Sequence, residues 1–569
     1  MPKPRGSASP PQASSAWGCA WLRVCILYFQ PALTLQQQAN QSFENRRRWL
    51  QAAGASAATL WLPRSAWSQP RWAANPFTLG VASGAATPSS VLLWTRLHLP
   101  GVAAASLGSD PITVRWELAD DEGFRRIVHS GQTLAPPELA HSVHLEVPGL
   151  APERWYFYRF MVGDHVSPVG RTLTLPRPQD QVQRLRLAYA SCQKWEDGFF
   201  SAWRHLRAEH PDGVVFLGDY IYEYPGRSSR VRVPSGGWVL TLDDYRRRYA
   251  LYKSDPDLQA MHAACPWWVT WDDHEVQNDY AGEQQGNSGY ASPAVDFAIR
   301  RAAAYQAWYE HMPVRQTVLT RSLAGLASGA EMRIHGRVQF GQLADLYLLD
   351  ARQYKDPQAC TKDGAPGSGR VDTARCPTWL DPRRSILGRA QEQWLESELA
   401  RTSSRQTRWQ MLGQQTLFGS LGSKIGSGQT LWNDGWDGYQ AARTRLTQAL
   451  QQHAVPNPVF LGGDVHENWV GHVKQDYANP GSPAVGVEFC GTSISSRSGG
   501  NAQTAQRLAN NPHFVFADAQ HRGYGLLDFT PHQLRTTLRG LDDVSRQDSS
   551  VATLASFVVQ SGRPVVELA

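Results

Sequence analysis

The sequence predicts an α/β sandwich, in which helices cover stacked sheets, preceded by a small all-β sandwich domain. The chain has 569 residues, which is too long for one hydrophobic core and indicates two or more domains. Residues 76–175 consist of short apolar or alternating runs separated by turns rich in Gly, Pro and Asp, a pattern typical of antiparallel sheets. From residue 185 onward such runs alternate with helical segments, which is typical of sheets covered by helices.

The all-β region contains five predicted strands. They span residues 78–81, 90–96, 112–118, 141–147 and 155–162. A stretch of about 100 residues is the size of one sandwich, and Tyr156 follows residues 149–152 as in the tyrosine corner of immunoglobulin-like domains. We therefore expect an immunoglobulin- or fibronectin-like domain at 75–176, a linker at 176–183, the α/β domain at 184–545 and a carboxy-terminal segment at 546–569.

The α/β region contains both helical and strand-like segments. Predicted helices span 199–209, 242–261, 296–311 and 388–401. Predicted strands span 185–190, 338–350, 407–412, 459–462, 485–489 and 525–529. The segments 419–428 and 499–505 are predicted to be mobile loops.

The composition excludes several classes of protein. The chain is 42% hydrophobic and 19% charged, which is ordinary for a globular protein. Its formal net charge is +6, and Lys and Arg occur in pairs and triples rather than in longer blocks, so no specific nucleic-acid complex is expected. No apolar run reaches the length of about 18 residues that a membrane-spanning helix needs.

Two of the seven cysteines, Cys360 and Cys376, bracket a polar loop rich in Gly, Asp and Pro. A disulfide that closes this loop would contribute about 3 kcal/mol in the chain-entropy model. It would also fit an oxidising compartment. The alternative is a pair of unpaired thiols.

Residues 45–63 have the pattern of an export signal. Arg46, Arg47 and Arg48 precede a weakly apolar stretch at 52–62, as the basic region of a signal peptide precedes its apolar region. The paired arginines, followed by an aromatic residue and Leu, resemble a twin-arginine signal. We expect residues 1–74 to be an extension with a signal peptide, the twin-arginine export machinery to be a partner, and the mature protein to be periplasmic or secreted. The alternative is an amphipathic helix of the folded protein.

Four short polar clusters each follow an apolar, strand-like run. They lie at 191–193, 218–223, 272–275 and 463–466. The carboxyl ends of neighbouring strands meet at the ligand-binding edge of an α/β sheet, so we expect the clusters to converge. Carboxylates, a phenol, a thiol and an imidazole at one edge predict a metal site, of the kind that a two-metal phosphoesterase has.

The first two clusters supply three candidate ligands. Cys192 lies between polar neighbours just after a strand, which favours a thiolate ligand over inert packing. Asp219 and Tyr222 follow the next strand and reach the same edge. A carboxylate can bridge two cations, and an ionised phenol favours ferric iron over zinc. The alternative is a turn aspartate with a packing tyrosine.

The third cluster places four ionisable residues in a row, Asp272 to Glu275. Its three acidic groups repel one another unless cations neutralise them. Asn278 adds a neutral oxygen as a candidate ligand. We expect one residue here to bind metal and His274 to act on the leaving-group oxygen or on phosphate, because His is easily poised near neutral pH. The alternative is an exposed acidic turn that caps the next helix.

The remaining candidates follow two further strands. Asp464 and His466 flank one residue, and positions i and i+2 of a strand end point the same way. Arg352 follows the predicted strand 338–350, where it can clamp phosphate oxygens in a bidentate fork. The alternative for Arg352 is a surface residue at a strand end.

With these clusters in order, the sequence resembles the PhoD family of alkaline phosphatases and phosphodiesterases, a branch of the calcineurin-like metallophosphoesterases. The resemblance runs from residue 75 to beyond residue 529 and includes 77–84, 93–96, 349–354 and 491–495. It implies a four-layer αββα metallophosphoesterase sandwich. Cys192 replaces the first aspartate of the wider superfamily, and Asp464 with His466 replaces its final paired histidines, as is typical of the PhoD branch.

The resemblance also implies the cofactors and their ligands. Ferric iron would be held by Cys192, Asp219, Tyr222 and His466. One or two calcium ions would be held by Asp219, Asp464 and an oxygen of Asp273 or Asn278. Asp464 in place of His suits calcium, which prefers hard oxygen ligands. We expect His274, Arg352 and Asp273 to be the catalytic residues, with Arg352 in contact with phosphate.

The predicted function is an exported, metal-dependent hydrolase of small phosphate esters, in which metal-activated hydroxide attacks phosphorus in line. This is an alkaline phosphatase with phosphodiesterase activity. One alternative is a phospholipase-D-like phosphodiesterase that acts on lipid or teichoic-acid substrates. Another is an extracytoplasmic binding module whose metals are structural.

Overall fold

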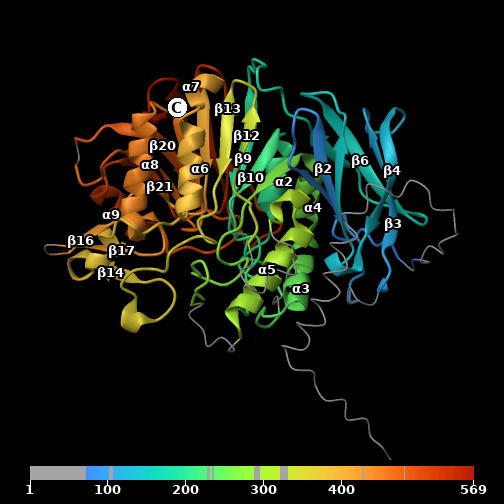
Figure 1. Cartoon of the computed structure of the whole chain (residues 1–569), viewed down its shortest axis with the longest axis horizontal. Coiled ribbons are helices and arrows are strands. Elements are labelled where there is room, and N and C mark those ends of the chain that lie inside the picture. The colour runs from blue at the N-terminus through green and yellow to red at the C-terminus, as the bar shows by residue number, and fades with distance from the viewer. Residues whose placement is uncertain are drawn as a thin grey trace, which may run out of the picture.

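The structure is a computed structural model (Figure 1). It describes residues 72, 74–101, 107–226, 231–233, 236–287, 295–320, 331–425, 428–479 and 481–569. The predicted twin-arginine signal at 45–63 lies outside these residues. Among the described helices, none is long and apolar enough to cross a bilayer.

The larger of two central sheets has ten strands in the order β25-β24-β23-β22-β9-β10-β11-β1-β2-β5. Their bounds are β1 (Val81–Gly84), β2 (Ser90–Arg96), β5 (Ser142–Pro148), β9 (Leu185–Ala190), β10 (Gly213–Phe216), β11 (Pro266–Val269), β22 (Gly523–Phe529), β23 (Gln533–Leu541), β24 (Val551–Gln560) and β25 (Glu567–Leu568). Strands β9, β10 and β11 are parallel, so their carboxyl ends share one edge.

The second central sheet has seven strands in the order β12-β13-β15-β18-β20-β19-β21. Their bounds are β12 (Gly336–Phe340), β13 (Ala344–Leu348), β15 (Trp409–Gly413), β18 (Pro458–Gly462), β19 (Asn468–Lys474), β20 (Ala484–Cys490) and β21 (Phe514–Asp518). Strands β13, β15, β18 and β20 are parallel. This sheet therefore also has an edge where several carboxyl ends meet.

Eight helices complete the described α/β region. They are α2 (Ser201–Ala208), α3 (Leu242–Lys253), α4 (Pro256–Ala264), α5 (Phe297–His311), α6 (Arg389–Leu399), α7 (Thr402–Arg405), α8 (Gln440–Gln452) and α9 (Asn501–Asn510). Figure 1 shows α2 to α5 in front of the ten-stranded sheet and α6 with α8 over the seven-stranded sheet.

Alternating side chains explain how the sheets and helices pack. On β9 and β10, Leu187 and Val215 enter a core that also contains Leu346 and Val459 of the seven-stranded sheet. Their sequence neighbours Ala188 and Val214 enter a different core with Trp203 of α2 and Met261 of α4. A third core joins Leu412 and Phe460 to Leu395 of α6 and Leu446 of α8. Period-two burial thus stacks the two sheets and leaves their outer faces for helices, and the predicted α/β class is confirmed.

Two smaller sheets lie outside this stack. One has β3 (Ile112–Ala119), β4 (Ile127–Ala135), β6 (Trp155–Val162), β7 (His165–Val166) and β8 (Gly170–Leu173). The other has β14 (Arg370–Asp372), β16 (Ser423–Ile425) and β17 (Gly428–Trp432). The backbone N–H of Ala151 donates to Tyr156 Oη at 3.0 Å, as expected for a tyrosine at a sandwich corner.

The amino-terminal strands do not form a separate pair of sheets. Ser83 of β1 pairs in parallel with Pro266 of β11, so β1, β2 and β5 extend the ten-stranded sheet. At the other end, β24 and β25 of the predicted carboxy-terminal segment form its edge. The sheet therefore crosses the predicted limits at 176 and 545, while the immunoglobulin- or fibronectin-like type of the first domain stays a prediction.

Four local predictions were wrong, and for the first two the structure shows the reason. The single helix at 242–261 divides where Asp255 accepts from the N–H groups of Asp257 and Leu258 and Pro256 begins a new helix. The strand at 338–350 is the hairpin β12–β13, which turns at Gly341 with φ of 56°. The loop predicted at 499–505 begins α9, and the loop predicted at 419–428 includes strand β16.

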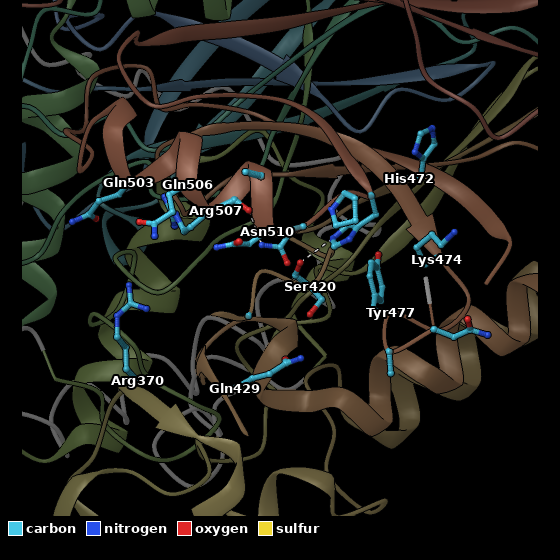
Figure 2. Close-up of a pocket in the computed structure, with 17 residues that line it drawn as sticks. Arg370, Ser420, Gln429, His472, Lys474, Tyr477, Gln503, Gln506, Arg507 and Asn510 are labelled. Atoms are coloured by element: carbon cyan, nitrogen blue, oxygen red, sulfur yellow. Dashed lines mark hydrogen bonds between the residues drawn. The ribbon is translucent and has the colours of Figure 1, made fainter. Parts of the chain in front are cut away.

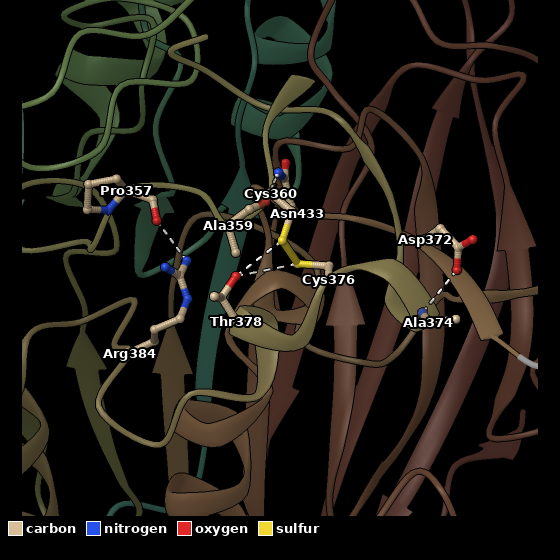
Figure 3. Close-up of a disulfide and its surroundings, with 9 residues drawn as sticks. All are labelled: Pro357, Ala359, Cys360, Asp372, Ala374, Cys376, Thr378, Arg384 and Asn433. Carbon is tan, nitrogen blue, oxygen red and sulfur yellow. Dashed lines mark hydrogen bonds between the residues drawn. A yellow bond between two sulfur atoms is a disulfide. The ribbon is translucent and has the colours of Figure 1, made fainter. Parts of the chain in front are cut away.

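The predicted disulfide between Cys360 and Cys376 is confirmed (Figure 3). Both sulfurs lie near the hydroxyl of Thr378, at 3.1 and 3.7 Å. The bond links the segment before β14 to the 3₁₀ turns after it, and Asn433 donates to the carbonyl of Ala359 next to the bond at 2.8 Å. The loop is therefore fixed to Asn433, which directly follows strand β17 of the three-stranded sheet.

Candidate metal centre

The four polar clusters meet at the carboxyl ends of the parallel strands. Potential ligand atoms of Cys192, Asp219 and His466 lie within 4.8 Å of one another. The same limit of 4.8 Å holds for the ligand atoms of a second group, Asp219, Asp273 and His274, and of a third group, Asp272, Asp273 and Asp464. Because Asp219 and Asp273 each belong to two groups, the three groups form one continuous cluster.

Backbone hydrogen bonds join the loops that carry these residues. The N–H of Cys192 donates to the carbonyl of Gly218 at 3.0 Å, and the N–H of Gln193 donates to that of Asp219 at 3.0 Å. A Cβ on Gly218 would lie 2.5 Å from the backbone nitrogen of Asp272, and one on Gly463 would lie 2.3 Å from Ser191 Oγ. The glycines before Asp219 and Asp464 therefore allow four strand ends to approach closely.

Four of the candidate ligands occupy the left-handed backbone region. Their φ angles are 61° for Cys192, 59° for Asp219, 64° for Asp464 and 58° for His466. For a residue other than Gly, a backbone with positive φ costs free energy that the surrounding structure must offset. Such residues are concentrated at functional sites. The same unusual conformation recurs after β9, β10 and β18, where it turns each side chain toward the cluster.

Tyr222 lies between two of the candidate ligands. Its hydroxyl is 2.8 Å from Asp219 Oδ2 and 3.1 Å from His466 Nε2. Ser496, which follows β20, donates to Tyr222 Oη at 2.8 Å. His466 Nδ1 lies 2.7 Å from the carbonyl of Arg497, which fixes Nδ1 as the donor and leaves Nε2 with a lone pair facing the cluster.

Arg352 is buried behind the acidic residues, and its side chain is 2% exposed. Its Nε donates to Asp272 Oδ1, and one terminal nitrogen donates to Asp434 Oδ2 at 2.6 Å. The other terminal nitrogen lies 3.7 Å from Asp273 Oδ2. Burial alone would lower the pKa of Arg352, but these carboxylates raise it well above its ordinary value. The arginine therefore supplies a permanent charge to the acidic cluster.

His274 is held by a buried carboxylate. Its Nδ1 lies 2.7 Å from Glu223 Oε2, and its ring centroid is 4.1 Å from that of Tyr222. Burial alone would lower the pKa of His274, whereas Asp273, Asp219 and Glu223 raise it well above its ordinary value. Glu223 orients the ring and leaves Nε2 for a substrate oxygen, so the residue suits proton donation.

The protein alone leaves this cluster electrostatically unsatisfied. Burial, with neighbouring carboxylates, raises the pKa of Cys192 and Asp219 well above their ordinary values, and burial raises that of Asp464 to about 6. Asp219 Oδ1 and Asp272 Oδ2 are buried oxygens that lack a hydrogen-bond partner among the described residues. A cation would supply the missing partner and charge. The residues therefore fit bound metal ions.

Asn278 lies beside this cluster with different contacts. Its backbone N–H donates to Glu223 Oε1 at 2.9 Å, and its side-chain nitrogen donates to the carbonyl of Asn287 at 2.8 Å. These bonds place Asn278 next to the Glu223–His274 pair. Its role as a metal ligand stays a prediction.

Sequence reasoning missed several residues that support the centre. Ser496 follows a parallel strand, so the strand-end rule that found Cys192 could have found it. Glu223 was part of a recognised cluster but had no assigned role. The strand-end rule could not have found Asp434, because this residue follows β17 of the small three-stranded sheet and not a strand of the two central sheets. It nevertheless accepts from Arg352 and, at 2.5 Å, from Lys355 Nζ.

Comparisons with known proteins agree with this geometry. The model of the family "PhoD-like phosphatase" matches residues 187–538, and that of its N-terminal domain matches residues 63–176. Alkaline phosphatase D from Bacillus subtilis (strain 168) is 40% identical over 550 residues, which cover 92% of this chain and 90% of that protein. A solved structure described as the structure of PhoD has a TM-score of 0.80 and 40% identity, and the match covers 88% of this chain and 93% of that one.

Proposed function

Because the chain belongs to the PhoD-like phosphatase family and is a phosphoric ester hydrolase, we propose that it is exported and hydrolyses small phosphate esters with ferric iron and calcium at this centre. The single observation that carries the proposal is the continuous cluster in which Asp219 and Asp273 each join two ligand groups. We further propose that the stacked sheets and outer helices are the four-layer sandwich of that family. The family's dependence on metal agrees with the unsatisfied oxygens of the cluster.

The residues divide into two ligand sets. Cys192, Tyr222 and His466 would hold iron together with Asp219, because thiolate, phenolate and imidazole donors suit a transition metal. Asp219 would bridge to calcium, which Asp464 and an oxygen of Asp273 or Asn278 would also hold. Thr416 Oγ1 donates to Asp464 Oδ2 at 2.6 Å and so orients that carboxylate.

The cations, when bound, supply Lewis acidity that activates water and polarises the phosphoryl oxygens. His274 would donate a proton to the leaving-group oxygen, with Glu223 holding its Nδ1. Arg352 would balance the charge of Asp272 and Asp273 and keep both carboxylates directed at the centre. Contact between Arg352 and phosphate remains part of the proposal, although three carboxylates already surround its guanidinium.

Export by the twin-arginine route is proposed from the sequence at 45–63. The disulfide between Cys360 and Cys376 supports it, because such bonds persist in oxidising compartments. Fusing residues 1–74 to a reporter that functions only after folded export would test it. Replacing Arg46 and Arg47 by Lys should retain the reporter in the cytoplasm.

Metal analysis with a visible spectrum tests the cofactor assignment. We expect about one iron per chain, calcium, and an absorption band from charge transfer between Tyr222 or Cys192 and ferric iron. Chelation should remove the metals and the hydrolysis together. A correctly folded protein that hydrolyses phosphate esters without either metal would contradict the proposal.

Tyr222→Phe separates the ligand assignment from general loss of activity. The substitution keeps the ring and removes the oxygen, so the phenolate band should disappear while the protein stays folded. Tyr220→Phe is the matched control, because Tyr220 is also buried but its hydroxyl bonds to His262 at 2.9 Å. An unchanged band in Tyr222→Phe would show that this phenol does not bind iron.

The relative rates on nitrophenyl mono- and bis-phosphate test the preference between monoesters and diesters. Both substrates place one phosphoryl group at the same cations, so both should depend equally on Asp219. Activity on the diester alone would favour the phosphodiesterase alternative.

A further inference from the structure

A large groove lined mainly by polar side chains lies outside the metal centre (Figure 2). Its volume is about 1000 Å³, at the upper end of the range for ligand pockets. Its walls are α9 with the loop that follows it, strand β19 with the turn after it, and strands β14 and β17 of the small three-stranded sheet. Four separate stretches of the chain therefore line one space.

The groove is positively charged. Among its described lining residues none is Asp or Glu, whereas Arg370, Lys474 and Arg507 are basic. Arg507 is neutralised by Glu467 at 2.5 Å. No carboxylate in the described parts of the chain forms an ion pair with Arg370 or Lys474, so both charges are available to a ligand. Figure 2 shows the guanidinium of Arg370 directed from β14 toward α9.

The other lining groups suit hydroxyl groups. Six primary amides line the groove, from Gln429, Asn479, Gln503, Gln506, Asn510 and Asn511. Amides both donate and accept, as hydroxyl groups do. Tyr477 adds an aromatic ring, packed at 4.9 Å against His513. Burial lowers the pKa of His513 to about 4, so this ring is neutral near pH 7 and adds no charge.

None of the candidate metal ligands lines the groove. Glu467, which holds Arg507 on the groove wall, is the residue after His466. We therefore expect a ligand in the groove to leave the candidate metal ligands uncontacted.

We propose that this groove is a second ligand site, which binds an anionic saccharide or polyol, a hydroxyl-rich chain that carries phosphate, sulfate or carboxylate groups. Arg370 and Lys474 hold the anionic groups, and the amides bind the hydroxyl groups between them. The inference goes beyond the proposed function, because it requires neither metal nor turnover.

Calorimetric titration of the metal-loaded enzyme with a disulfated disaccharide tests the proposal, because sulfate esters resist a phosphatase. Arg370→Gln combined with Lys474→Gln should weaken binding more than about tenfold, since two charged hydrogen-bond donors are lost. Lys362→Gln combined with Arg535→Gln is the matched control and should leave affinity unchanged, because both residues are exposed and lie outside the groove. Hydrolysis of p-nitrophenyl phosphate should be unchanged in both double variants, which shows that they are folded.

Two further titrations define the ligand and the site. Inorganic sulfate and the unsulfated disaccharide should each bind more weakly than the sulfated disaccharide, and equal affinity for either would overturn the ligand class. Saturating the metal centre with vanadate should leave the affinity for the sulfated disaccharide unchanged. Loss of binding on adding vanadate, or equal affinity in the Arg370 and Lys474 variant, would overturn the second site.

Discussion

The strand-end loops, which are the four polar clusters, and the disulfide-linked segment, defined as residues 357–381 with residues 428–436, meet at Arg352 but hold their side chains by different means. In the strand-end loops, Cys192 and Asp219 have positive φ angles and their backbones are joined directly by hydrogen bonds. In the other segment, the side chain of Asn433, next to Asp434, bonds to the backbones of Ala359 and Gly369, and a disulfide joins the adjacent Cys360 to Cys376. The first region is fixed by two sheets, and the second is fixed by side-chain hydrogen bonds next to a crosslinked loop.

This difference predicts which substitutions should abolish activity and which should only reduce it. A strand-end ligand touches the cluster directly, so no other residue replaces it. Asp434 acts one step away, through Arg352 and Lys355. Groups that orient a metal ligand from outside typically change activity by about 10- to 100-fold, and loss of the ligand itself should exceed that range.

The largest effect is expected for Asp219→Asn. The change removes a charge shared by two ligand groups, and kcat/KM for nitrophenyl phosphate should fall more than about 100-fold with loss of bound metal. Asp212→Asn is the matched control at the opposite end of β10, where Asp212 accepts from the backbone of Arg186 at 2.8 Å. Its activity should stay within about threefold of the wild type. Equal losses in the two variants would show that the carboxyl end of β10 has no special role.

An intermediate effect is expected for Asp434→Asn. Two buried cations, Arg352 and Lys355, lose their shared carboxylate, so the free energy of unfolding should fall by about 3 kcal/mol. Activity should fall about 10- to 100-fold, because Arg352, the partner of Asp272 and Asp273, is no longer held in place by Asp434. Denaturant unfolding and steady-state kinetics measure the two effects.

Asp381→Asn is the control for that variant within the same segment. Asp381 pairs with Arg383, whose side chain is 88% exposed, so the substitution should change neither quantity measurably. If Asp434→Asn behaves like Asp381→Asn, the link between the segment and the acidic cluster has no catalytic consequence.

Local patterns in the sequence were enough to predict part of the fold and part of the metal centre. Residues 185–190 are a short apolar run with a polar residue after it, so both strand β9 and the position of Cys192 follow from the same stretch. The same reasoning found Asp219 and the pair Asp464 and His466. The disulfide also followed from a local feature, since its two cysteines bracket one short loop.

The parts that sequence reasoning missed depend on contacts between distant segments. Ser83 pairs with Pro266 across the ten-stranded sheet, and nothing near either residue indicates that register. Asp434 reaches Arg352 from the small three-stranded sheet, whose strands lie partly in a stretch that predicted a loop. The local periodicity of apolar residues indicates which face of a strand is buried, but it does not indicate which strand lies beside it.

The smallest effect on activity is expected when the disulfide is removed. Replacing Cys360 and Cys376 together by Ser opens a loop with a sequence separation of 16, which should lower the free energy of unfolding by about 3 kcal/mol in the chain-entropy model. The hydrogen bonds of Asn433 to Ala359 and Gly369 remain, so Asp434 should stay in place and kcat at 25 °C should fall less than about threefold. Unfolding with and without reductant measures the stability, because reductant should destabilise the wild type and leave the double variant unchanged. A loss of activity as large as that of Asp434→Asn would contradict this expectation. It would mean that the crosslink itself holds Asp434 against Arg352, and that the disulfide-linked segment is as rigid as the strand-end loops only while the bond is intact.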